Sequence, residues 1–162
     1  MARFAPRKAK IEVAEVFSYA CIHCARFQPV VDTWLKKKPR DVQWEYVPAV
    51  FGGPFTAFAA AYYAADQLGV RERSHSAVFK AIFDEKSVKT SEPSAIADLY
   101  ARWGVKPAAF LAAMNGAPVQ DKLAMARRFA VDTGITGTPA SFRRCAYSSP
   151  SSRKGSAPAV ST

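Results

Sequence analysis

Two cysteines separated by two residues, Cys21 and Cys24, are the side chains whose type and spacing most directly indicate chemistry. A Cys-x-x-Cys pair at the start of a helix suits thiol–disulfide exchange, because the unpaired N–H groups and the positive dipole end there stabilise a thiolate. Such a setting lowers the pKa of a thiol from about 8.5 into the range of roughly 3.5–7.5. We therefore predict that Cys21 exchanges disulfides and that Cys24, one turn further in, is the resolving thiol.

His23 lies between the two cysteines. An imidazole at this position can donate a hydrogen bond to the Cys21 thiolate and add positive charge when protonated. Because a stabilised thiolate stabilises the reduced form, it makes the disulfide a stronger oxidant. We predict that His23 tunes the redox potential; the alternative is an exposed histidine with no role.

Other chemistries of a Cys-x-x-Cys pair fit less well. A closed zinc site needs four ligands, and the remaining candidates, Cys145, His23 and His75, have no recognisable spacing. A c-type haem site requires histidine directly after the second cysteine, where this chain has Ala25. Two inert buried cysteines stay an alternative. We expect no metal and no cofactor other than the redox-active disulfide itself.

The segments around the pair predict a β–α–β unit. Residues 11–18 are rich in β-formers and partly alternate, which favours a strand that leads into the cysteines. Apolar residues then recur at helical spacing, which predicts a helix whose buried face carries Cys24, Phe27, Val31, Trp34 and Leu35. A second strand is predicted at residues 42–47, so the two strands are parallel with a right-handed crossover.

The chain from 55 to about 133 has the apolar spacing of helices throughout. Its aromatic stripes are most simply core, and we give them no cofactor-binding role. The chain is thus predicted to comprise a basic N-terminal segment, a β–α–β part with the Cys pair, a helical insertion, a return helix with its loop, and a disordered tail. These units span residues 1–10, 11–53, 54–116, 117–140 and 141–162.

The 162-residue chain has a formal net charge of +10, but this charge is concentrated at its ends. Eight of its 23 basic residues lie in 1–10 and 140–162, which contain no acid, so the remainder carries 15 basic and 13 acidic side chains. A nucleic-acid interface would need basic residues clustered on the folded body, so we predict no nucleic-acid partner. No apolar h-region of a signal peptide is visible near the start.

The sequence from Glu15 to Cys24, Phe27, Gly52-Gly53 and Gly137-Thr138-Pro139 resembles the DsbA family, the periplasmic disulfide-forming oxidoreductases of Gram-negative bacteria. The resemblance covers about residues 11–140. It implies an α/β thioredoxin-like fold with an inserted all-helical domain. The low thiol pKa and oxidising potential known for the family are expectations from this resemblance.

The same resemblance assigns further site residues. Thr138-Pro139 is expected to be a cis peptide bond beside the disulfide, where the adjoining backbone binds an extended substrate. Glu15 matches the family's buried acid, which assists proton movement during exchange. The implied partners are newly exported or unfolded cysteine-containing proteins and a membrane reoxidase of the DsbB type, and the implied location is the periplasm.

Some features depart from the family pattern. The dipeptide between the cysteines is Ile22-His23, where the best-known members have proline-histidine, so their potential does not transfer. The family continues after the proline into a strand, a turn, a second strand and a helix, whereas residues 141–162 are rich in serine, which favours a disordered tail. We interpret residues from about 140 as a frameshifted or misassembled end, the start as truncated, and the C-terminal sheet hairpin as missing.

The leading function is introduction of disulfide bonds into exported proteins. A reductase or isomerase on the same fold would use the same residues at a different potential. A non-catalytic interaction module with a vestigial Cys-x-x-Cys is the alternative from another class.

Overall fold

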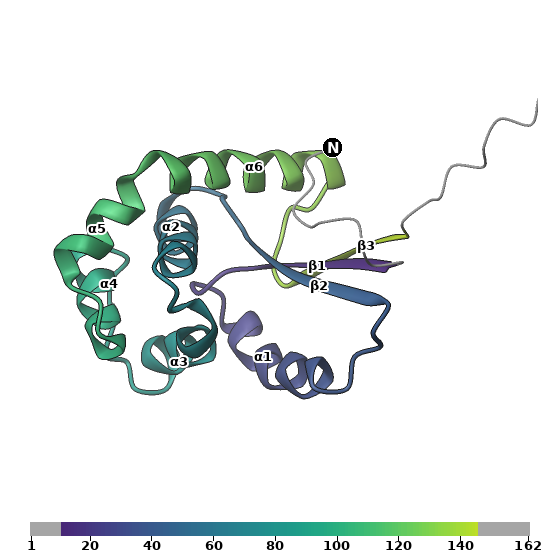
Figure 1. Cartoon of the computed structure of the whole chain (residues 1–162), viewed down its shortest axis with the longest axis horizontal. Coiled ribbons are helices and arrows are strands. Elements are labelled where there is room, and N and C mark those ends of the chain that lie inside the picture. The colour runs from purple at the N-terminus through teal and green to yellow at the C-terminus, as the bar shows by residue number, and fades with distance from the viewer. Residues whose placement is uncertain (1–10, 146–162) are drawn as a thin grey trace, which may run out of the picture.

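A three-stranded sheet with helices on both faces forms the part of the chain that carries the cysteines (Figure 1). The computed structural model describes residues 11–145, and its strands are β1 (Ile11–Phe17), β2 (Val42–Pro48) and β3 (Ala140–Cys145). They lie in the order β2-β1-β3, with β1 parallel to β2 and antiparallel to β3. The predicted parallel pair is confirmed, and β1 becomes the central strand of the sheet.

Helix α1 (Ile22–Leu35) connects the parallel strands and packs on one face of the sheet. Its buried residues are Cys24, Gln28 and Val31. The predicted buried face is therefore partly wrong, because Phe27 and Trp34 are 37% and 38% exposed. Counted from Cys24, positions i, i+4 and i+7 of the helix face the core. The polar Gln28 is therefore buried, whereas its neighbour Phe27, which the apolar spacing predicted to be buried, is not.

Helices occupy most of residues 53–133, which agrees with the prediction of helices from 55 to about 133. They are α2 (Gly53–Gln67), α3 (Arg71–Phe83), α4 (Pro93–Tyr100), the short 3₁₀ helix η1 (Ala101–Trp103), α5 (Pro107–Asn115) and α6 (Ala117–Thr133). Proline stands in the first turn of α2, α4, α5 and α6, where its missing N–H leaves no helical bond unmade. These helices lie beside the sheet, and α6 returns across its second face (Figure 1).

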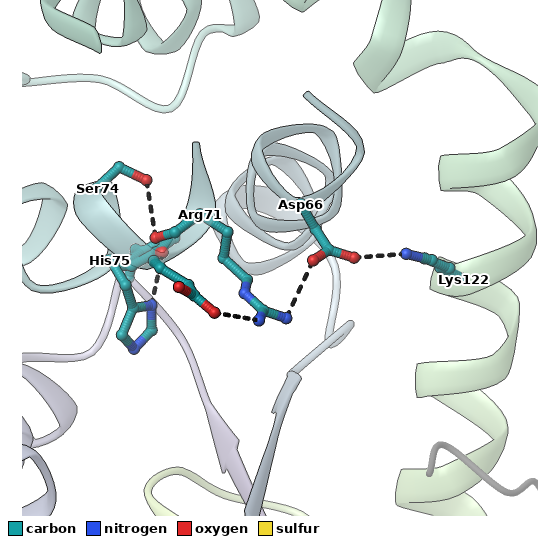
Figure 2. Close-up of polar contacts among 7 residues, drawn as sticks. Asp66, Arg71, Ser74, His75 and Lys122 are labelled. Carbon is teal, nitrogen blue, oxygen red and sulfur yellow. Dashed lines mark hydrogen bonds and ion pairs between the residues drawn. The ribbon is translucent and has the colours of Figure 1, made fainter. Parts of the chain in front are cut away.

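Ion pairs centred on Asp66 connect three of these helices, α2, α3 and α6. The Asp66 carboxylate at the end of α2 lies 3.0 Å from Arg71 Nη1 at the start of α3. Its other oxygen lies 2.7 Å from Lys122 Nζ on α6 (Figure 2). Because all three side chains are partly exposed, these ion pairs contribute modestly to stability. They connect α2 to α3 through Arg71 and α2 to α6 through Lys122.

The predicted disordered tail begins too early. Residues 141–145 belong to β3, which pairs with β1 from Val16↔Ala140 to Ile11↔Cys145. An edge strand such as β1 without β3 offers unpaired N–H and C=O groups to an extended segment that reaches it. In addition, the half-buried Phe142 of β3 packs on Phe129 of α6, with 5.6 Å between the ring centroids. The remaining predictions for residues 1–10 and 146–162, including the second strand of the hairpin, lie outside the described residues.

A pair of substitutions on β3 tests this strand. Replacing Phe142 by Ala removes its contact with Phe129 and should lower the free energy of unfolding by about 1–3 kcal/mol, because the ring is half-buried. Arg143→Ala, on the exposed face of the same strand, should change it by less than about 0.5 kcal/mol. Urea unfolding followed by circular dichroism measures both, and equal losses would contradict the packing of β3.

Candidate functional site

Cys21 is the N-cap residue of α1, with φ −103° and ψ 113°. The backbone N–H of Cys24 donates to Cys21 Sγ at 3.4 Å, so the sulfur takes the place that a serine or aspartate oxygen usually fills at a helix start. A tight turn after β1 delivers the residue there, since Cys21 N donates to Ser18 O at 3.0 Å. The prediction that the pair begins a helix is confirmed.

The two thiols have opposite acidities. Burial acts to raise the pKa of Cys21, but hydrogen bonds from Thr138 and from the N–H groups of Cys24 and His23 outweigh it, so this pKa lies below its usual value. Burial raises the pKa of Cys24 to about 12. Cys24 is 1% exposed, and both cysteines are free thiols. The arrangement gives one accessible, acidic thiol and one buried thiol that holds its proton.

His23 contributes to this site through its main chain. Its N–H is one of the donors that lower the pKa of Cys21, as expected for the first turn of a helix. The imidazole is exposed and makes no hydrogen bond with the residues that the structure describes. A role for the ring in setting the redox potential stays a prediction.

The Thr138–Pro139 peptide bond is cis, as the family resemblance implies. This loop lies directly against the first cysteine, whose Sγ donates to the carbonyl oxygen of Thr138 at 3.4 Å. The register of the sheet explains the contact, because Val16 and Ala140 are paired on neighbouring strands and the two loops follow from the same end. That the loop binds substrate stays a prediction.

Glu15 is buried on β1, with 1% of its surface exposed. Its Oε2 has no hydrogen-bond partner within the described part of the chain. Burial, together with the nearby Asp32 carboxylate, raises the pKa of Glu15 to about 7. The prediction of a buried acid is confirmed, whereas its role in proton transfer to a cysteine stays a prediction.

Sequence reasoning missed a buried hydrogen-bonded chain on the same side of the sheet. Tyr19 OH lies 2.8 Å from His75 Nδ1, and His75 Nε2 lies 3.1 Å from Gln28 Oε1. The amide nitrogen of Gln28 in turn donates to Asp32 Oδ1 at 2.8 Å. The available signal was Gln28 itself, a polar residue four positions after Cys24. His75 was considered only as a zinc ligand, and no group of three His, Cys, Asp or Glu between residues 11 and 145 is placed to hold a metal ion.

Known proteins share this geometry. A profile of the DSBA-like thioredoxin domain matches residues 12–144. The thiol:disulfide interchange protein DsbA of Pseudomonas syringae pv. tomato is 36% identical over 130 residues. The crystal structure of oxidoreductase DsbA from Xylella fastidiosa superimposes with a TM-score of 0.82 at 44% identity, covering 86% of this chain and 76% of that one. For DsbA of Pseudomonas aeruginosa the TM-score is 0.76 at 33% identity, covering 86% and 72%.

The chain belongs to the DSBA-like thioredoxin domain family. The match to the Pseudomonas syringae protein covers 80% of this chain and 60% of the relative, so the chain spans about 60% of the length of that curated DsbA. The α/β thioredoxin-like fold with helices 53–133 set between β2 and β3 agrees with the expectation from the resemblance. None of the helices described between residues 11 and 145 is long and apolar enough to cross a membrane.

The side chain of Thr138 can be tested as a determinant of the acidity of Cys21. Thr138→Val keeps the shape and the carbonyl but removes the hydroxyl, so the pKa of Cys21 should rise by roughly half a unit to one unit. Thr136→Val, an exposed position in the same loop, should leave this pKa unchanged. Ultraviolet absorbance of the thiolate against pH measures both, and an unchanged pKa in Thr138→Val would mean that main-chain donors alone set the acidity.

Glu15 should make stability depend on pH in a defined direction. Its pKa rises from 4.5 to about 7 on folding, so the unfolded chain binds fewer protons between these values and stability falls as pH rises through them. Glu15→Gln removes this loss. The variant should therefore exceed the wild type in unfolding free energy by about 1–3 kcal/mol above about pH 7, and by little near pH 4.

Denaturant unfolding of both proteins across this pH range measures the difference, which isolates Glu15 because His75 titrates equally in both. Glu92→Gln changes an exposed glutamate before α4 and should give no such pH-dependent gain. A constant difference between Glu15→Gln and the wild type would contradict the raised pKa.

Proposed function

We propose that this chain is a thiol:disulfide oxidoreductase that introduces disulfide bonds into cysteine-containing proteins through Cys21 and Cys24. The observation that carries the proposal is the position of Cys21, an N-cap thiol with a lowered pKa next to a buried thiol whose pKa is about 12. Membership of the DSBA-like thioredoxin domain family supports it.

The exchange is proposed to proceed in two displacements. A substrate thiolate attacks Cys21 Sγ in the Cys21–Cys24 disulfide, which breaks that bond and releases Cys24 as a thiolate. Because the pKa of Cys24 is about 12, the released group takes up a proton at neutral pH. A second substrate thiolate then attacks the substrate sulfur of the mixed disulfide and releases Cys21 as a thiolate. The substrate gains a disulfide, and the protein is left reduced.

Other residues have supporting roles in this proposal. Glu15, with a pKa of about 7, can supply the proton that Cys24 takes up, through an intervening water molecule because no hydrogen bond joins their side chains in the described structure. The backbone beside Pro139 is the proposed binding edge for an extended substrate. Ile22 and Phe27, each 37% exposed on α1, offer apolar surface to an unfolded chain.

The proposed setting follows from the family. Substrates are newly exported or unfolded proteins with free cysteines, the compartment is the periplasm, and a membrane reoxidase of the DsbB type restores the disulfide. The acidity of Cys21 favours an oxidase over a reductase or isomerase, since a stabilised thiolate stabilises the reduced form and makes the disulfide more oxidising.

Equilibration against glutathione tests the oxidase. We expect a reduction potential well above the value of about −270 mV that is typical of thioredoxin, near or above the value of about −180 mV typical of protein disulfide isomerase. Thiolate absorbance or alkylation followed by mass spectrometry gives the reduced fraction. A potential near that of thioredoxin would exclude the oxidase and favour a reductase.

A trapping variant separates catalysis from the non-catalytic module. Cys24→Ala removes the resolving thiol, so the Cys21 thiolate should attack a disulfide-bonded peptide, release one of its sulfurs as a thiolate, and remain in a mixed disulfide that accumulates. With Cys145 replaced by Ser in both proteins, the double variant Cys21→Ser/Cys24→Ala should trap nothing. Loss of trapping in Cys24→Ala would leave the Cys-x-x-Cys pair without a demonstrated reaction and favour the vestigial motif.

A further inference from the structure

His75 lies on α3, outside the Cys-x-x-Cys segment. It packs against β1 and the following turn, which lead to that segment. Its side chain is 6% exposed. Figure 2 shows its position one turn along α3 from Arg71. Aromatic rings surround the imidazole at centroid distances of 4.4 to 5.8 Å, and these belong to Phe17, Tyr19, Tyr46, Tyr62 and Phe79. A polar ring in this position requires hydrogen-bond partners on both nitrogens.

The hydrogen bonds around His75 can run in one direction only. The amide nitrogen of Gln28 donates to both Asp32 and Tyr46, each at 2.8 Å, so Oε1 is its acceptor. His75 Nε2 faces this oxygen and must therefore carry a hydrogen. Burial lowers the pKa of His75 to about 3, so the ring is neutral and Nδ1 is left to accept from Tyr19 OH.

This neutral ring joins the two segments that flank Cys21. Tyr19 stands in the turn before it, where Ala20 N donates to Ser18 Oγ at 3.1 Å and Cys21 N donates to Ser18 O at 3.0 Å. Gln28 stands on α1 after it, one turn beyond Cys24 and on the same buried face. The donors that reach the Cys21 sulfur come from the first turn of this helix. The direction in which these N–H groups point depends on how the turn before Cys21 is placed relative to α1.

We propose that His75 is a positioning residue for the redox site. Through Tyr19 it holds the turn, and through Gln28 it holds α1, so that the first N–H groups of the helix point at the Cys21 sulfur. The ring acts by geometry, since it carries no charge. The inference rests on the proposed function, because it concerns how the exchanging thiolate is presented.

Titration of Cys21 in three variants tests the proposal. Tyr19→Phe deletes the hydroxyl that donates to His75 and keeps the ring, and His75→Leu removes both hydrogen bonds. Each should make Cys21 a weaker acid by about threefold to tenfold in its dissociation constant. Tyr63→Phe is the matched control, because that hydroxyl is also buried but has no hydrogen-bond partner within the described residues. It should leave the acidity of Cys21 unchanged.

The outcomes separate positioning from simple stabilisation. If Tyr19→Phe and His75→Leu lower the melting temperature while Cys21 keeps its wild-type acidity, His75 is only structural and the proposal is overturned. A shift of equal size in Tyr63→Phe would also overturn it. Where His75→Leu does not fold, Tyr19→Phe decides. The mixed-disulfide trap is independent of these titrations, so its failure removes the proposed function, whereas failure of the titrations removes only the role of His75.

Discussion

The proposed redox chemistry depends above all on the contact between the Cys21 sulfur and the N–H groups at the start of α1. The sheet topology brings its parts together. Central strand β1 ends at Phe17 and passes through one turn to Cys21, while neighbouring β3 begins directly after Pro139. Because these strands are antiparallel and Val16 pairs with Ala140, the loop before β3 lies over the loop after β1. Thr138 therefore meets a sulfur that is 117 residues away in sequence.

The interior beneath the pair contains buried polar side chains, Glu15, Gln28 and His75 among them. Burial raises the pKa of Glu15 to about 7 and lowers that of His75 to about 3, so a buried acid and a buried base each resist ionisation. Asp32, nearer the surface, accepts hydrogen bonds from Gln28 and Ser76 and lines an open cavity of about 450 Å³. Burial therefore weakens both the acidity of Glu15 and the basicity of His75 beneath the helix terminus that acts on Cys21.

The sequence was sufficient for features that are local. The pair at a helix start, the parallel strands and the helices between residues 53 and 133 follow from spacing, and the cis bond at Pro139 followed from family resemblance. The sequence was insufficient where contacts between segments far apart in the chain determine the structure. Phe142 becomes part of a strand only because β1 has an open edge and α6 supplies Phe129. His75 has no local signal at all, since its partners lie 56 and 47 residues away.

The unequal burial of the two sulfurs makes the redox balance sensitive to few contacts. Reduction of the disulfide leaves two sulfurs, but Cys24, with a pKa of about 12, stays a thiol, so the negative charge of the reduced form resides on Cys21. Each hydrogen bond to that sulfur then favours the reduced form alone. These bonds come from the first turn of α1 and from the side chain of Thr138, and His75 of α3 contacts the turn between β1 and α1 through Tyr19. The helices inserted between β2 and β3 carry neither cysteine, yet through His75 they influence the redox balance of the pair.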